Sequence, residues 1–175
     1  MKIVIVNGSG GCGKSTFEQM CTNINGERCT LICSTIDVIK EAARVMGWKG
    51  GKEQKDRKFL SDLKDLATEY NDCSYNYVLN KVNYFHDDLC DYGVEKQGIV
   101  FVDCREPQEI QKFVDRLGAI TVLIRRPSVN SQDFSNHADA EVENFDYDYY
   151  IDNDGDLYDL RAKAEYFLDS ILKVE

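Results

Sequence analysis

The chain has 175 residues, of which 43% are hydrophobic and 30% are charged, and its formal net charge is −10. This length is typical of one domain with a sizeable core, and the composition is that of a soluble globular protein. The acidic balance argues against a general affinity for nucleic acid or for an anionic membrane, because both require basic surface. We therefore expect neither partner.

Cysteine usage points to a reducing compartment. The seven cysteines form no C-x-x-C pair, and their number is odd. Only Met1 and Lys2 precede the first strand-like run. This apolar segment is too short for an export or membrane signal. We expect reduced thiols in a cytoplasmic protein; a disulfide framework or a zinc site is the alternative.

Five short apolar segments are typical of strands, and they alternate with helical patterns. Continuous apolarity in the first of them predicts a central parallel strand that is buried on both faces. The alternation predicts a parallel sheet covered on both sides. The expected strands are Ile3–Val6, Cys29–Cys33, Ile99–Val102, Ile120–Ile124 and Tyr149–Ile151.

Helices are predicted from about Ser15 to Asn23 and from about Leu157 to Leu172, the latter capped by residues 153–156 (NDGD). The long interval between the second and third strands contains two further helical stripes, separated by a turn at residues 71–74. We expect the apolar faces of these helices to point into the core. The two stripes consist of Phe59, Leu60, Leu63, Leu66, Ala67 and Tyr70, and of Tyr75, Val78, Leu79, Val82, Phe85 and Leu89.

The segment after the first strand has the pattern G-x-x-x-x-G-K-[ST], read as Gly8, Gly13, Lys14 and Ser15. Glycines let successive backbone amides turn toward phosphates, and the helix that follows adds its N-terminal amides and dipole. Lysine reaches the β- and γ-phosphates, and the serine hydroxyl binds Mg²⁺. The alternative without a binding function is a glycine-rich turn that contains a lysine by chance. The predicted phosphate-binding residues for ATP or GTP are Gly8, Ser9, Gly10, Gly11, Cys12, Gly13, Lys14, Ser15 and Thr16.

The rest of the chain narrows the class of phosphate-binding protein. A GTPase would carry a base-reading N-K-x-D segment, and none is present. The chain has one large elaboration, residues 37–97, between the second and third strands. The interval at this place holds the phosphoryl acceptor in small P-loop kinases.

The order of these motifs resembles the nucleoside monophosphate kinase-like family, above all the phage-type deoxynucleoside monophosphate kinases. The resemblance implies an α/β fold of three layers with a five-stranded parallel sheet in the order 2-3-1-4-5. It also implies a single kinase domain over residues 1–175. Its core would comprise residues 1–36 and 98–175, with a helical acceptor-binding insert at 37–97 and a short lid at about 126–145.

The resemblance assigns four residues to the acceptor. Residues 34–37 (STID) resemble the S-T-G-D of adenylate kinases, which implies acceptor roles for Asp37 and Lys40. Residues 57–61 (RKFLS) resemble an R-x-x-L-Q segment, which implies that Arg57 holds the acceptor's phosphate. A helix cap and a solvated helix face are the respective alternatives.

Residues 102–109 (VDCREPQE) are similar to a D-V-R-x-x-x-E motif. Asp103 would hold a Mg²⁺-bound water or orient the acceptor, and Arg105 would bind a phosphate. Their place after the third strand agrees with this reading, because ligands gather at the carboxyl ends of parallel strands.

Further positions follow from the same resemblance. Arg125 and Arg126 open the lid and would neutralise charge on the transferred group, with His137 as a possible third member. The turn Asn153, Asp154 and Gly155 would lie near the donor base, although its conformation alone also explains these residues.

The sequence therefore predicts ATP- and Mg²⁺-dependent phosphoryl transfer to a small phosphorylated acceptor, namely a (deoxy)nucleoside monophosphate. Lys14, Asp103, Arg125 and Arg126 are the expected catalytic residues, and we expect a monomer or homodimer. The alternatives are another acceptor, such as dephospho-coenzyme A or phosphomevalonate, or a nucleotide-binding regulator without efficient transfer.

Overall fold

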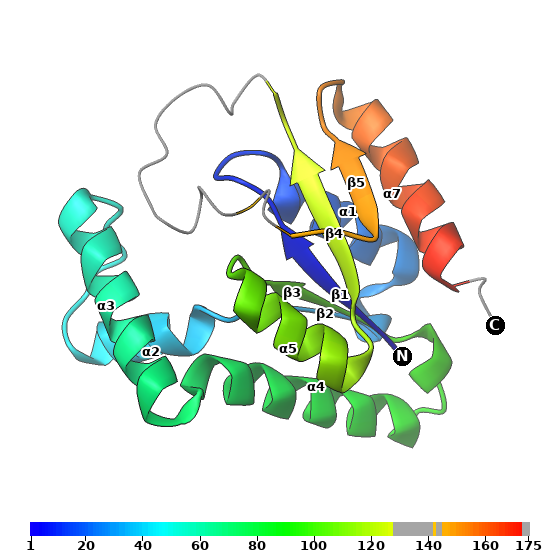
Figure 1. Ribbon diagram of the computed structural model, residues 1–175. Coiled ribbons are helices and arrows are strands. Elements are labelled where there is room, and N and C mark those ends of the chain that lie inside the picture. The colour runs from blue at the N-terminus through cyan, green and yellow to red at the C-terminus, as the bar shows by residue number, and fades with distance from the viewer. Residues whose placement is uncertain (128–141, 143–144, 173–175) are drawn as a thin grey trace.

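The computed structural model describes residues 1–127, 142 and 145–172. Its five strands form one sheet in the order β2-β3-β1-β4-β5, and all neighbouring strands are parallel (Figure 1). This arrangement confirms the predicted fold class and strand order. The strands are β1 (Lys2–Asn7), β2 (Thr30–Ser34), β3 (Ile99–Asp103), β4 (Ile120–Arg125) and β5 (Tyr149–Asp152).

The central strand β1 is buried on both faces, as its continuous apolar run predicts. Val4, Ile5 and Val6 have no solvent exposure. In register, Val6 lies between Asp103 of β3 and Val122 of β4. The carboxyl end of β1 is therefore enclosed by the carboxyl ends of its neighbours, where a ligand site in such a sheet is expected.

Helices cover both faces of the sheet. Helices α1 (Lys14–Asn25) and α7 (Leu157–Leu172) lie on one face, where Val4 and Val6 pack with Phe17 and Phe167. Helices α4 (Cys73–Asp91) and α5 (Pro107–Leu117) lie on the other, and their buried side chains join those of Ile3 and Ile5. Alternate side chains of one strand thus serve two cores, which confirms the three layers. Short 3₁₀ turns, η1 (Glu27–Cys29) and η2 (Glu95–Gln97), precede β2 and β3.

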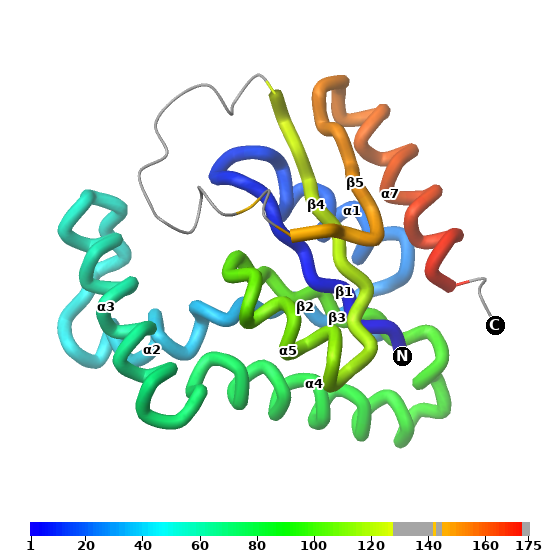
Figure 2. Tube along the Cα trace, viewed as in Figure 1, coloured from blue at the N-terminus to red at the C-terminus, as the bar shows by residue number. Residues whose placement is uncertain are grey.

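The interval 37–97 contains α2 (Asp37–Val45), α3 (Gln54–Asn71) and α4. Figure 2 shows that α3 stands beside the sheet rather than on it, whereas α4 runs beneath the sheet. The buried residues Val78, Val82 and Leu89 confirm the apolar stripe predicted for α4. Part of the predicted insert is thus a layer of the core.

The prediction that the stripe of α3 faces the core is wrong. Leu66 and Tyr70 are 65% and 85% exposed, and the buried residue of this helix is Lys64. Periodicity identifies a helix but not the neighbours that cover it; α3 packs mainly against α2 and α4. Leu157, at the start of α7, is also 65% exposed, contrary to expectation. The turn predicted at residues 71–74 is shorter in the structure and consists of Asp72 alone. This residue lies between α3 and α4 and has a φ of 52°.

All seven cysteines are free thiols, as predicted. Burial raises the pKa of Cys21 and of Cys33 to about 12. In the described part of the chain, no helix is long and apolar enough to cross a membrane.

The packing of α7 on the sheet can be tested at Phe167. Its ring is 2% exposed and lies 5.6 Å from that of Phe17 and 5.2 Å from that of Tyr149, measured between centroids. We expect Phe167→Ala to lower the free energy of unfolding by about 3–5 kcal/mol in urea titrations. Tyr166→Ala, at a neighbouring position that is 76% exposed, should change it by less than about 0.5 kcal/mol. Similar losses in both variants would contradict the packing.

Candidate functional site

The glycine-rich loop joins β1 to α1 and requires glycine for steric reasons. Gly8 has a φ of 146°, and a Cβ atom there would lie 2.4 Å from the carbonyl oxygen of Ile124. Gly13 has a φ of 105°, and a Cβ atom there would lie 2.3 Å from Nδ2 of Asn153. Any other residue at these two positions would displace the neighbours that shape the loop.

Lys14 closes the loop into a ring. Its Nζ donates to the carbonyl oxygens of Gly8 at 2.6 Å and Ser9 at 3.2 Å. The first amides of α1, including those of Ser15 and Thr16, have no partner within the helix and lie at the positive end of its dipole. The loop therefore combines a lysine with helix amides in the arrangement that binds phosphate groups.

Asn153 stabilises this loop through a hydrogen bond to its backbone. The side chain is 7% exposed, and its Nδ2 donates to the carbonyl oxygen of Cys12 at 2.8 Å. The sequence predicts that Asn153, Asp154 and Gly155 lie near the donor base, which stays a prediction; the structure shows that Asn153 also bonds the loop backbone. Asp154 faces Lys163 at 3.7 Å, and Gly155 borders the pocket described next.

A pocket of about 530 Å³ opens beside the loop. This volume is within the range of small-molecule sites. The exposed side chain of Leu157 gives it an apolar wall, while Lys14 and Arg126 give it positive charge. The pocket is lined by Gly11, Gly13, Lys14, Ser15, Thr16, Arg126, Asn153, Gly155, Asp156, Leu157 and Leu160.

The two predicted lid arginines have different surroundings. Arg126 lines the pocket, and its Nε is buried without a hydrogen-bond partner among the described residues. Arg125 forms a pair with Asp152, with N–O distances of 2.7 and 3.1 Å, and its guanidinium lies 5.0 Å from the ring centre of Tyr150. The structure thus brings Arg126, and not Arg125, to the pocket. Most of the predicted lid, including His137, lies outside the described residues.

Asp103 lies within electrostatic range of four other predicted site residues, namely Lys14, Asp37, Lys40 and Arg105. It ends β3, and its Oδ1 is buried without a partner among the residues that the structure describes. Burial raises the pKa of its carboxyl group; the charges of Lys14, Arg105 and Lys40 oppose this shift and that of Asp37 adds to it. Charges from the loop and from the predicted acceptor residues therefore influence the pKa of the same carboxyl group.

The predicted acceptor residues Asp37 and Lys40 lie in the segment after β2. Oδ2 of Asp37 accepts from the amide of Ser34 at 2.8 Å, and Lys40 lies 4.0 Å from the other oxygen. Asp37 therefore stabilises the turn that starts α2, whatever else it binds. Arg57 lies on the exposed first turn of α3, where its Nε donates to the carbonyl oxygen of Lys52 at 3.1 Å.

Sequence reasoning missed Glu18. This residue of α1 is 1% exposed, and its Oε1 has no hydrogen-bond partner within the described part of the chain. Burial, and then the nearby Asp103, raises its pKa to about 8, whereas Lys14 lowers it. A signal was available, because Glu18 follows Lys14 by one helical turn and sits between the apolar residues Phe17 and Cys21.

Asn7, at the end of β1, is a second residue of the site that was not predicted from the sequence. It has no solvent exposure, and its Oδ1 accepts from the amide of Gly8 at 2.7 Å. Its Nδ2 donates to the carbonyl oxygen of Arg105 at 3.2 Å and to the hydroxyl of Tyr147 at 2.7 Å. That hydroxyl donates to the carbonyl oxygen of Val142 at 2.9 Å, and burial raises the pKa of Tyr147 to about 12.

Comparisons with known proteins give the fold a context. The chain matches no protein-family model and no curated protein sequence. Solved structures with a similar fold include the APS kinase of Mycobacterium tuberculosis, which is 17% identical with a TM-score of 0.44 over 97% of this chain and 96% of that chain. A thymidylate kinase from Ehrlichia chaffeensis is 11% identical with a TM-score of 0.49 over 95% and 98%. Neither likeness assigns an activity to this chain.

The burial of Glu18 predicts a pH-dependent stability. Its pKa of about 8 in the folded chain exceeds the ordinary 4.5, so folding retains a proton that the unfolded chain loses between these values. Stability should therefore fall as pH rises through this window. Relative to the parent, Glu18→Gln should gain on the order of 1–3 kcal/mol in unfolding free energy between about pH 5 and pH 8. Urea titrations at both pH values measure this gain, and a difference that does not vary with pH would contradict it.

Proposed function

We propose that this chain transfers the γ-phosphoryl group of ATP to a small phosphorylated acceptor, a (deoxy)nucleoside monophosphate. The observation that carries the proposal is the position of Asp103, with Lys14 of the phosphate loop and Arg105 and Lys40 of the acceptor side all acting on it. A site that holds two phosphorylated ligands needs positive groups on both sides of the reacting centre.

The donor fits the pocket beside the loop. Its phosphates would lie against the loop amides and Lys14, and its base against the apolar wall formed by Leu157. The Ser15 hydroxyl and the unpartnered Oδ1 of Asp103 suit a hard cation that keeps some of its waters, so these residues would hold Mg²⁺. A cation held by these residues would supply positive charge that offsets part of the charge of the donor's phosphates.

The chain's own residues would act mainly by position and charge. Lys14 would exchange its bonds to the Gly8 and Ser9 carbonyls for bonds to phosphate. Arg126 would approach the transferred group, while Arg105 would hold the acceptor's phosphate in line with it. In this class of reaction, alignment and charge neutralisation supply most of the rate enhancement.

The reaction can be tested by measuring ADP formation from ATP with a panel of deoxy- and ribonucleoside monophosphates, dephospho-coenzyme A and phosphomevalonate. We expect at least one deoxynucleoside monophosphate to stimulate turnover, and Lys14→Ala to reduce kcat by at least about 10²-fold while the protein stays folded. If only a non-nucleotide acceptor stimulates turnover, the chain is a kinase for that acceptor and the proposed nucleoside monophosphate is wrong. Slow hydrolysis that no acceptor changes would overturn the proposal and favour a nucleotide-binding regulator.

The different surroundings of the two arginines give a second test. Arg126→Ala should lower kcat by on the order of 10²–10³-fold, because it removes a positive group from the donor pocket. Arg125→Ala should lower Tm through loss of its pair with Asp152, with an effect on kcat at least about tenfold smaller than that of Arg126→Ala. Equal losses of kcat in two folded variants would refute this division.

A further inference from the structure

Lys64 occupies an unusual position in α3. Its side chain is the buried one of this helix, 8% exposed, whereas Leu66 and Tyr70 of the predicted apolar stripe are in solvent. A buried ammonium group is strongly disfavoured unless it is paired. The contacts of Lys64 therefore add to the packing of α3 against α2 and α4.

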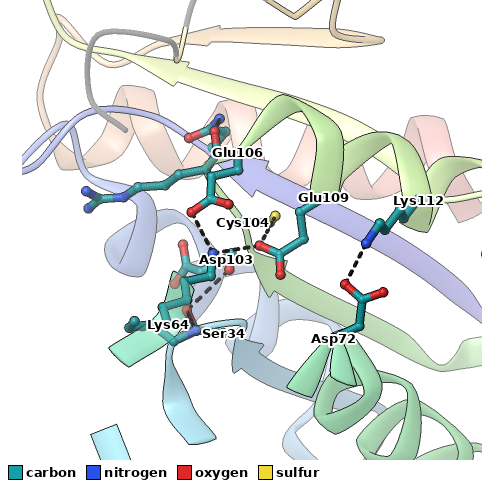
Figure 3. Close-up of polar contacts among 11 residues, drawn as sticks. Ser34, Lys64, Asp72, Asp103, Cys104, Glu106, Glu109 and Lys112 are labelled. Carbon is teal, nitrogen blue, oxygen red and sulfur yellow. Dashed lines mark hydrogen bonds and ion pairs between the residues drawn. The ribbon is translucent and has the colours of Figure 1, made fainter. Parts of the chain in front are cut away.

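Lys64 binds two carboxylates of the segment that starts α5 (Figure 3). Its Nζ donates to Oε1 of Glu106 and to Oε2 of Glu109, each at 2.8 Å. Glu109 is 7% exposed and also accepts from Sγ of Cys104 at 3.3 Å. Burial by itself lowers the pKa of Lys64, but the two carboxylates outweigh it and the pKa is raised. The contact is thus a charged bridge between α3 and the core, buried at Glu109 and half-exposed at Glu106.

A second ion pair fixes the direction of α3. Asp72, where α3 ends, lies 2.6 Å from Nζ of Lys112. Lys112 follows Glu109 by about one turn of α5, so α5 presents a negative and then a positive group. The α3 helix presents the opposite order, Lys64 and then Asp72. The order of charges on α3 is therefore complementary to that on α5.

The bridge connects the two predicted phosphate-binding arginines. Glu106 follows directly on Arg105, whose charge acts on Asp103, and Glu109 lies three residues further on. On α3, Arg57 precedes Lys64 by seven residues, about two helical turns, which places both on related faces of the helix. Lys64 therefore joins the helix that carries Arg57 to the segment that follows Arg105.

The geometry points to Lys64 and Glu109 as positioning residues for the phosphoryl acceptor. Their bridge holds the helix that carries Arg57 against the segment that carries Arg105, so that both can engage one acceptor. The role in the reaction rests on the proposed function, whereas the anchoring of α3 does not. Displacement of a binding group by about 1 Å can reduce a rate by about 10²-fold, so loss of the bridge should be visible in acceptor use.

The test uses Lys64→Met in the full chain, together with the double variant Lys64→Met/Glu109→Met, which leaves no unpaired buried charge if the single variant fails to fold. Lys58→Met is the matched control, because it removes an exposed ion pair, 2.7 Å from Asp62, on the same helix. Hydrogen exchange without substrates, ATP affinity and acceptor kinetics are measured for each protein.

In the Lys64 variants we expect the amides of α3 to exchange at least about tenfold faster, while those of β1 and β3 keep their rates. ATP affinity should stay within about twofold, and the acceptor KM should rise by at least about tenfold. Lys58→Met should match the parent in all three measurements. Unchanged exchange of α3 in a folded Lys64 variant would refute the anchor. Faster exchange with an unchanged acceptor KM would refute the positioning role. If no acceptor supports turnover in the parent, the proposed function and this positioning role fail together, and hydrogen exchange still decides the anchor.

Discussion

A single buried amide, that of Asn7, joins parts of the site that are far apart in the sequence. From the end of the central strand it bonds the first amide of the phosphate loop, the carbonyl of Arg105 and the hydroxyl of Tyr147, at sequence separations of up to 140 residues. Each buried polar group left without its partner would cost about 1–3 kcal/mol. The loop, the segment after β3 and the segment entering β5 are therefore positioned together.

The site is positive within an acidic protein, and it reaches this state through local structure rather than overall charge. Backbone amides and the start of α1 supply part of the positive potential, and Lys14 and Arg126 supply the rest. Two carboxyl groups, those of Glu18 and Asp103, lie close to Lys14 and would repel phosphate if both were ionised. Burial raises the pKa of each; that of Glu18 reaches about 8, which limits its negative charge at neutral pH.

Local patterns predicted the strand, loop and helix around Lys14, because each of these depends on neighbouring residues. The resemblance to known kinases supplied the strand order. The contacts of Asn7 and Asn153 could not be predicted, since their partners come from distant segments. The prediction that the apolar stripe of α3 faces the core was wrong for a related reason, because apolar spacing indicates that a helix forms but not what covers it. The distinction between Arg125 and Arg126 also needed the structure, because adjacent residues of an extended chain point in opposite directions.

In the proposed reaction, the loop and the neighbouring pocket hold the phosphates of the donor. A crystal structure with Mg²⁺ and a non-hydrolysable ATP analogue tests it most directly. We expect the terminal phosphates inside the ring of loop amides, with Nζ of Lys14 moved from the carbonyl of Gly8 to a phosphate oxygen and Nε of Arg126 bonded to the analogue. A structure in which the analogue binds elsewhere, or in which Lys14 keeps its bond to Gly8 with the analogue bound, would contradict the account.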